Sequence, residues 1–258
     1  MTDRFQGTYL IESPADIASV AEEMAGEQST ATGTRIAAET HELVERHGAR
    51  VERIDLLETI ATPTLESSLG ANGPCRRARL TLSWPMHNVG TSLPILLTTL
   101  LGNQTGMRRL TGIRLEHLAL PAAMVAQAAL PRFGITGTRE LTGVQGRPLI
   151  GCIVKPNIGL TPEQTAEAAL ALAEGGVDFI KDDELIANPP YSPVAERARC
   201  VMQVLNDFAD RTGKRVMYAF NISDEFDEMR RHHDAVVAHG GNCVMVNVNG
   251  VGLSGVAA

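Results

Sequence analysis

Lysine is scarce in this sequence, aromatic residues make up only 4% of it, and long apolar runs are missing. A membrane-spanning helix needs about 18 uninterrupted apolar residues, and no segment approaches that length. The opening residues MTDRFQGTYLIESP lack the basic region and apolar stretch of a secretory signal, so we expect a cytoplasmic location. The formal charge of -7 gives no basic footprint for nucleic acid or for an anionic membrane surface.

The cysteines show no CxxC spacing, and each lies in or beside an apolar run. This pattern indicates reduced, structural side chains rather than a disulfide framework or a zinc site. Hydrophobic residues make up 44% of the chain and charged residues 21%, which is enough apolar material for one large or two ordinary domains. The cysteines are Cys75, Cys152, Cys200 and Cys243.

The lysines of this chain are Lys155, Lys181 and Lys214, and its other basic residues are arginines. An amine can be deprotonated or carbamylated, or can serve as a base, whereas a guanidinium cannot practically do so. The few lysines of a chain whose other basic residues are arginines therefore indicate positions where an amine is needed. Lys214 lies in the turn DRTGKR, where we interpret it as an ordinary surface residue.

From Leu149 onward a short apolar strand, a polar loop and an amphipathic helix alternate, which is typical of parallel βαβ units. The first predicted helix has Thr161 as its N-cap, Pro162 at its first position and Gly175 beyond its end. Two further helices are predicted at Ser192–Asp210 and Asp224–Ala238. The predicted strands are Leu149–Lys155, Val177–Asp182, Arg215–Ile222 and Cys243–Asn249.

A parallel repeat of this kind forms either an open doubly wound sheet or a closed eight-stranded barrel. No GxGxxG motif follows the first predicted strand, which disfavours a nucleotide-binding sheet. A complete barrel takes ~250 residues, and residues 149–258 accommodate only four of its strands. We therefore expect the first half of a TIM (β/α)8 barrel and a natural product longer than this chain.

Residues 1–145 show strands and helices mixed without a parallel repeat, which indicates a separate α+β domain. The stretch Leu130–Arg147, rich in Gly, Thr and Arg, is interpreted as a linker. The barrel half then covers residues 146–258. Strands are predicted near Gln6–Glu12 and Arg77–Trp84, and helices at Asp16–Ala25, Thr40–His47 and Leu93–Leu101.

The segment GGVDFIKDDE, residues 175–184, carries the strongest indication of chemistry. An apolar strand ends there in Lys181 followed by three acids, and catalytic groups of parallel barrels lie at that end of the strands. Asp183 and Glu184 offer oxygen ligands that suit Mg²⁺, and a carbamylated lysine would add a third. An arbitrary KDDE tetrapeptide is more often a solvated loop with a local ion pair. The second strand-borne lysine, Lys155 in GCIVKPNIGL, favours the functional interpretation.

GxxxKPxxGL followed by GGxDFxKDDE resembles the first two barrel strands of the ribulose-bisphosphate carboxylase (RuBisCO) superfamily. AGEQST at residues 25–30 and LLGNQTG at residues 100–106 are similar to two N-terminal segments that reach the active site in that family. The resemblance spans nearly the whole chain. It implies an α/β protein with an N-terminal α+β, ferredoxin-like domain over residues 1–145, followed by the first βα units of a RuBisCO-type barrel.

The resemblance also implies roles for individual residues. Lys181 corresponds to the lysine that CO₂ carbamylates, and Asp183 and Glu184 complete the Mg²⁺ site with it. Lys155 corresponds to the acid/base group at the carbon that loses its proton, with Asn157 near the substrate. Substrate-binding residues also come from the N-terminal domain of a second subunit, so a homodimer is expected; these are Glu27, Thr32 and Asn103.

Departures from the carboxylating members place the chain on the RuBisCO-like side of the superfamily. Asn157 stands where those members have a second lysine, and Ile153 stands where they have a threonine. An asparagine cannot replace an ammonium that handles a carboxylated intermediate. Carbon fixation is therefore not expected, and what remains is metal-assisted removal of a proton beside a carbonyl.

Three functions stay open. The first is Mg²⁺-dependent enolisation or isomerisation of a keto-sugar phosphate without net CO₂ fixation. The second is a decarboxylase, or a transcarboxylase/hydrolase, acting on a 3-oxo sugar-acid phosphate of the isoapionate type. The third is a non-catalytic remnant, because half the barrel and its phosphate-binding loops are missing. In each catalytic case the ligand is a phosphorylated, sugar-derived small molecule.

Three other polar residues of the predicted barrel half are compatible with structural roles. His232 and His233 lie on the predicted helix Asp224–Ala238, away from strand ends, and are interpreted as surface residues. Asn221 ends a predicted strand in FNIS and suits a turn former as well as a site residue.

Overall fold

The structure is a computed structural model that describes residues 3–30, 38–65, 73–127 and 132–257. The chain divides into two compact units, Met1–Ala129 and Leu130–Ala258, each with its own hydrophobic core. The division falls earlier in the chain than the predicted boundary after residue 145.

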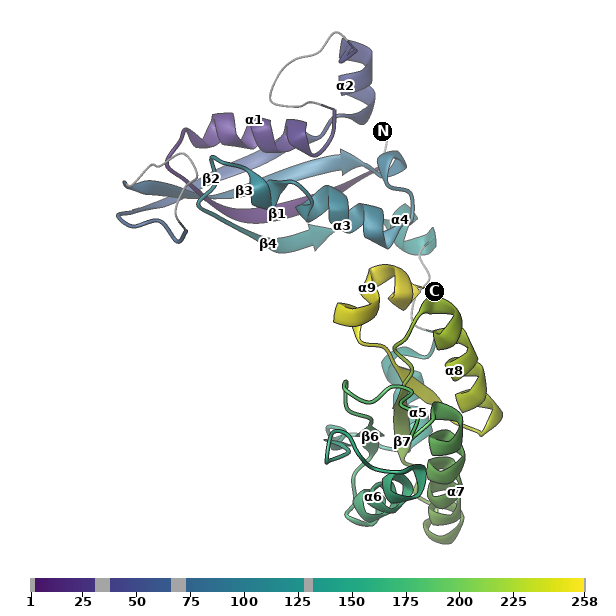
Figure 1. Ribbon diagram of the computed structural model, residues 1–258. Helices are drawn as coiled ribbons and strands as arrows, with labels where there is room; N and C mark the ends of the chain where they lie inside the picture. The colour runs from purple at the N-terminus through teal and green to yellow at the C-terminus, as the bar shows by residue number, and fades with distance from the viewer. Residues whose placement is uncertain (1–2, 31–37, 66–72, 128–131, 258) are drawn as a thin grey trace. The chain divides into compact units, whose positions relative to one another are not determined.

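The first unit is a four-stranded antiparallel sheet in the order β2-β3-β1-β4. The chain runs through β1, α1, β2, β3, α3 and β4, which is the ferredoxin-like arrangement. Figure 1 shows α1 lying along one face of this sheet. The bounds are β1 Arg4–Ser13, α1 Ile17–Glu27, α2 His41–His47, β2 Arg50–Ile60, β3 Cys75–Pro85, η1 Met86–Asn88, α3 Leu93–Leu101, η2 Gln104–Gly106, β4 Gly112–Ala119 and α4 Ala122–Gln127.

Alternation of buried residues on β1 builds the first core. Phe5, Tyr9 and Ile11 are fully buried, because successive side chains of a strand point to opposite faces. They pack with buried residues of α1 and α3, among them Met24 and Leu100. The other face is polar and carries cross-strand contacts such as the 2.8 Å hydrogen bond between Arg79 and Glu116.

Two strands of this sheet, β2 and β4, were missed in the sequence. The pairing of β2 with β3 shifts register between Val51 and Arg53 and again between Leu56 and Thr59. Such bulges break the alternation of apolar and polar residues by which a strand is recognised. β4 pairs with β1 across a similar irregularity at Thr8/Tyr9.

The second unit is a four-stranded parallel sheet in the order β5-β6-β7-β8, with helices between successive strands. Buried residues of α6, α7 and α8 pack on the strands to form its core. The two units have the predicted architecture, a ferredoxin-like α+β domain followed by four parallel strands with their connecting helices. The bounds are α5 Gly134–Thr142, β5 Gly151–Ile153, α6 Pro162–Glu174, β6 Phe179–Lys181, α7 Val194–Thr212, β7 Met217–Asn221, α8 Phe226–Ala238, β8 Cys243–Met245 and α9 Val248–Ala257.

Helix α6 begins as the sequence predicted. The Thr161 hydroxyl accepts a hydrogen bond from the backbone N–H of Gln164, and the Gln164 side chain accepts one from the backbone N–H of Thr161. This is a capping box, which satisfies two donors that the helix start would otherwise leave without partners.

Three expectations for the second unit were wrong. The predicted linker contains helix α5. The predicted strand Cys243–Asn249 ends at Met245, and α9 begins at Val248. His232 is buried, at 7% exposure, because its ring turns back toward the start of α8, where Nε2 lies 3.1 Å from a carboxylate oxygen of Asp224. His233 is exposed, as expected.

Candidate active site

Polar side chains gather at the carboxyl ends of the parallel strands in the second unit. Lys181 is the last residue of β6, and Asn221 is the last residue of β7. Lys155 follows β5 within two residues of its end. Because the strands are parallel, these ends meet at one edge of the sheet, which is where parallel barrels carry their active sites.

Two ion pairs join the lysines to the carboxylates at this edge. Lys155 Nζ lies 2.5 Å from Asp183 Oδ2, and Lys181 Nζ lies 2.8 Å from Glu184 Oε1. Lys181 is the more enclosed amine, since its side chain is 18% exposed against 55% for Lys155. The structure therefore brings together the four residues that the sequence singled out in this half of the chain.

Both carboxylates are held in the ionised form. The hydrogen bond from Lys155 lowers the pKa of Asp183, helped by the backbone N–H of Leu185. The hydrogen bond from Lys181 lowers the pKa of Glu184 in the same way. Metal ligands must be deprotonated, so this edge meets that requirement at neutral pH.

Asp182 has a different role from its acidic neighbours Asp183 and Glu184. It is 1% exposed, and its carboxylate accepts hydrogen bonds from Arg197 Nη2 at 3.1 Å and Tyr218 Oη at 2.6 Å. Arg197 is itself fully buried on α7. Burial raises the pKa of Asp182, and the guanidinium of Arg197 opposes that rise. Asp182 therefore anchors the loop that carries Asp183 and Glu184.

The Asn221 amide ties the same loop to β7, a role that the sequence left open. Its Nδ2 donates to the backbone carbonyls of Asp183 and Glu184, each at 3.2 Å. Its backbone N–H donates to Asp182 Oδ2 at 2.9 Å. Asn221 is fully buried, so these bonds are shielded from water. No sequence signal distinguished it from a strand-end turn former.

Glu27 and Asn103, the predicted site residues of the first unit, lie beside each other. Asn103 Nδ2 donates to Glu27 Oε1 at 3.2 Å, joining the end of α1 to the turn after α3. Thr32, the third predicted contributor, lies outside the residues that the structure describes. Asn157 is half-buried in the loop after β5.

Gln28, for which no sequence pattern indicated a role, holds this pair in place. With its amide oriented to satisfy both ends, its nitrogen donates to the carbonyls of Thr98 and Thr99 at 3.2 and 3.1 Å. Its side-chain oxygen accepts from the backbone N–H groups of Asn103 and Gln104 at 2.9 and 3.0 Å. Gln28 thus links the carbonyl end of α3 to the turn that carries Asn103.

The residues at the strand edge fit a hard divalent cation. Mg²⁺ binds through one or two carboxylates and keeps several waters, and Asp183 and Glu184 are ionised neighbours of an enclosed amine. Among the described residues, no group of three or more His, Cys, Asp or Glu side chains is arranged to hold a metal.

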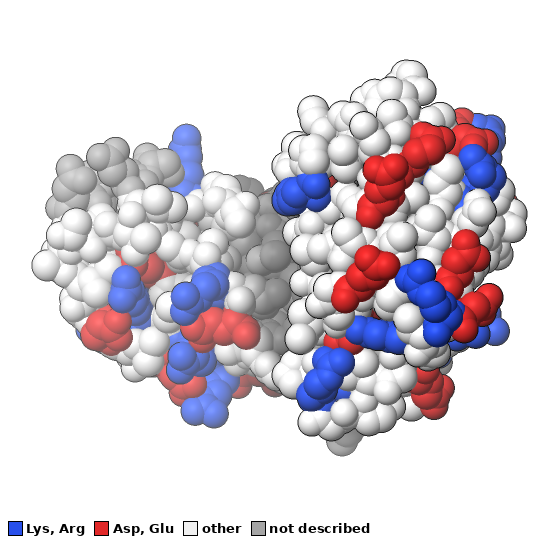
Figure 2. Space-filling model, turned by 90° about the horizontal axis from the view of Figure 1, so that it is seen from below, with Lys and Arg blue, Asp and Glu red and all other residues white. Residues whose placement is uncertain are grey.

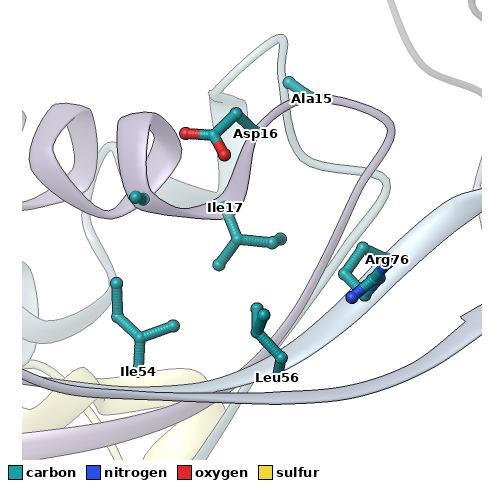
Figure 3. A pocket seen from close by; sticks show the side chains of 7 residues that line it. Ala15, Asp16, Ile17, Ile54, Leu56 and Arg76 are labelled. Carbon is teal, nitrogen blue, oxygen red and sulfur yellow. The ribbon is translucent and has the colours of Figure 1, made fainter.

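The first unit also contains a hollow, beside the start of α1. It has a volume of about 450 Å³ and is bounded by Asp16, Ile17, Ile54, Leu56 and Arg76 (Figure 3). The Asp16 carboxylate caps α1 by accepting from the N–H of Ser19 at 2.9 Å. The Asp16 carboxylate therefore has a capping role at the start of α1, whereas Glu27 lies at the other end of this helix.

Acidic and basic side chains are interspersed on the face of the molecule that Figure 2 shows. No helix in the described ranges combines the length and apolar character needed to cross a bilayer.

The fold is that of a two-domain α/β protein, with a ferredoxin-like domain followed by parallel strand-helix units. Lysines and carboxylates lie at the ends of its parallel strands. Residues 8–124 match the family described as ribulose bisphosphate carboxylase large chain, N-terminal domain. Residues 134–258 match ribulose bisphosphate carboxylase large chain, catalytic domain. The chain belongs to this family, as its motifs predicted.

Similar proteins include ones that are named RuBisCO-like. An uncharacterized ribulose bisphosphate carboxylase-like protein of Bordetella bronchiseptica is 65% identical over 100% of this chain and 61% of the relative. A 3-oxo-isoapionate-4-phosphate transcarboxylase/hydrolase of Xanthobacter autotrophicus is 50% identical over 99% of this chain and 62% of the relative. The crystal structure of a rubisco-like protein from Burkholderia fungorum matches with a TM-score of 0.90 at 46% identity, over 98% of this chain and 61% of that one. The chain thus spans about 60% of the length of these relatives.

Proposed function

We propose that this chain supplies metal-binding and acid/base groups for a reaction on a phosphorylated 3-oxo sugar acid, of the transcarboxylase/hydrolase or decarboxylase type. The observation that carries the proposal is the strand edge where Lys155 and Lys181 pair with Asp183 and Glu184. The 50% identity to the transcarboxylase/hydrolase favours this reaction over isomerisation of a keto-sugar phosphate.

Asp183, Glu184 and the carbamate of Lys181 would hold Mg²⁺, which when bound supplies an electrophile that polarises a substrate carbonyl. Lys155 Nζ would donate the proton that replaces the departing carboxyl group on the carbon beside that carbonyl, and in the enolisation alternative it would accept the proton from that carbon. Its pairing with Asp183 keeps the amine at the edge of the site. The buried contacts of Asp182 and Asn221 hold the loop still, so that little reorganisation is needed on binding.

Glu27 and Asn103, together with Thr32, are proposed to complete the site from the first unit of a second subunit in a homodimer. The hydrogen bond between Asn103 and Glu27 supports a shared role, because it presents an amide and a carboxylate as one polar group. Asn157 is proposed to contact the substrate from the loop after β5.

The test uses the protein expressed from its full reading frame, with Mg²⁺ and bicarbonate. NMR follows loss of the carboxyl group from carbon-13-labelled 3-oxo-isoapionate 4-phosphate. We expect turnover in the wild type and losses of roughly 100-fold or more in Lys155→Met and Lys181→Arg, since a positioned acid/base group alone contributes about 10²–10⁴-fold.

Lys214→Arg is the matched control. Lys214 contacts the carbonyl of Gly176 and the carboxylate of Asp178, which precede β6 rather than follow it. The conservative change should leave turnover intact. Turnover that persists unchanged in Lys181→Arg would exclude the proposed metal site.

Enolisation of a keto-sugar phosphate is the second candidate, favoured by the position of Lys155 next to an ionised carboxylate. Deuterium wash-in from D₂O into a panel of such phosphates separates the two. Exchange without loss of a carboxyl group supports enolisation, and neither activity supports a non-catalytic chain.

A further inference from the structure

A second cluster of metal-ligating atoms lies in the first unit, at the end of α2. His47 is the last residue of α2, and His87 and Asn88 belong to the turn η1 that follows β3. His47 Nδ1 lies 3.2 Å from His87 Nε2 and 2.8 Å from Asn88 Oδ1. The two rings meet edge to face, with centroids 4.9 Å apart. Two imidazole nitrogens and an amide oxygen therefore converge from two separate elements.

The orientation of the Asn88 amide is set by a further bond. Its Nδ2 donates to the backbone carbonyl of His47 at 2.7 Å, which turns Oδ1 toward the His47 ring. An amide oxygen only accepts hydrogen bonds, and each imidazole nitrogen carries either one proton or one lone pair. In one tautomer the N–H of His47 Nδ1 donates to Asn88 Oδ1, and in the other His47 Nδ1 accepts from the N–H of His87 Nε2. Either way, His47 Nδ1 fully satisfies only one of its two neighbours. A cation bound between the three atoms would satisfy all of them.

The spacing of these atoms suits a transition metal. Metal–nitrogen bonds of about 2.0–2.1 Å place neighbouring ligand atoms roughly 2.9–3.4 Å apart in tetrahedral or octahedral geometry. The separations of 3.2 and 2.8 Å lie at or near that range. Imidazole suits zinc, nickel and copper, whereas Mg²⁺ prefers oxygen ligands. We propose that His47, His87 and Asn88 form a binding site for a divalent transition metal such as Zn²⁺ or Ni²⁺.

A bound metal would tie α2 to the rest of its unit. None of the residues of α2 is buried, so packing contributes little to holding this helix. Its described attachments are polar, namely the bond from Asn88 to the His47 carbonyl and the bond from Arg4 Nη2 to the Gly48 carbonyl at 2.9 Å. Metal binding should therefore slow amide hydrogen exchange in α2, while exchange in β1 stays unchanged.

Calorimetric titration of the chain with Ni²⁺ and with Zn²⁺, in excess Mg²⁺ to saturate carboxylate sites, tests the proposal. We expect one binding event that is lost in His47→Ala and in His87→Ala. His117→Ala is the matched control, since His117 is exposed on β4 of the same unit. Asn88→Asp should tighten binding, because a carboxylate replaces a neutral oxygen.

The substituted side chains are exposed or half-buried, and circular dichroism checks that each variant folds. Binding of equal strength and stoichiometry in the double variant His47→Ala/His87→Ala would place the metal elsewhere and overturn the proposal. A wild type that binds neither metal would overturn it as well. Slower exchange in α2 that appears with metal and disappears in His87→Ala would support it independently.

Discussion

Replacing Arg197 by methionine tests whether a buried ion pair holds the site loop. Arg197 and Asp182 are 0% and 1% exposed, with Nη2 and Oδ2 3.1 Å apart. Methionine keeps much of the side-chain volume and removes the charge. The carboxylate of Asp182 would keep the bonds from Tyr218 and the Asn221 N–H but lose its counter-charge. The backbone carbonyls of Ser192 and Ala187 would lose donors at 2.6 Å.

The expected loss is large. Removing one partner of a buried pair costs about 3–5 kcal/mol, because an uncompensated charge is left behind. For a unit of this size 1 kcal/mol shifts Tm by about 3 °C, so the second unit should unfold roughly 10–15 °C lower. In the double variant Asp182→Asn/Arg197→Met the charge is gone, and part of the stability should return. Recovery is incomplete because the two carbonyls stay without the guanidinium.

The assay can separate the two units. The single tryptophan, Trp84, is buried in the first unit, so its fluorescence follows unfolding of that unit. Far-UV circular dichroism follows both. We expect Arg197→Met to lower the transition seen by circular dichroism and to leave the fluorescence transition in place. A second-unit transition that moves by less than about 1 kcal/mol, or a double variant no more stable than the single one, would refute the reasoning.

Three further predictions concern other parts of the chain. Glu12 is 3% exposed; burial acts to raise its pKa, but bonds from Thr64, Thr111 and Arg77 outweigh it and lower the pKa. The ionised Glu12 carboxylate therefore stabilises the folded state above about pH 4.3, and this stabilisation is lost as the pH falls through the lower folded-state pKa. In acid titrations followed by Trp84 fluorescence, the Glu12→Gln variant should lose less stability than the wild type. Thr161→Ala removes the capping box of α6 and should cost about 1 kcal/mol in denaturant unfolding of the second unit only; an equal shift of the fluorescence transition would contradict this. Gln28→Ala should lower kcat of the full-length protein by up to roughly 100-fold through misplacement of Asn103, with Gln6→Ala, exposed on β1, as the control.

Features that depend on neighbours along the chain could be predicted from the sequence alone. Alternation made β1 recognisable, and Thr161 with Gln164 set the start of α6. Lys181, Asp183 and Glu184 could be placed at a strand end because an apolar strand runs directly into them. The motifs that contain these residues also predicted the family, since the spacing of short segments can be recognised without knowledge of distant contacts.

Features that depend on partners far along the chain could be seen only in the folded protein. The folded protein gives Asp182 a different role from Asp183 and Glu184, because Arg197 on α7 and Tyr218 on β7 donate hydrogen bonds to the Asp182 carboxylate. It gave Asn221 and Gln28 positioning roles through bonds to segments remote in sequence. From the sequence alone, an asparagine or a glutamine is interpreted as a turn or surface residue. The direction in which a side chain points, and the groups that meet it there, follow from packing of whole elements and not from local spacing.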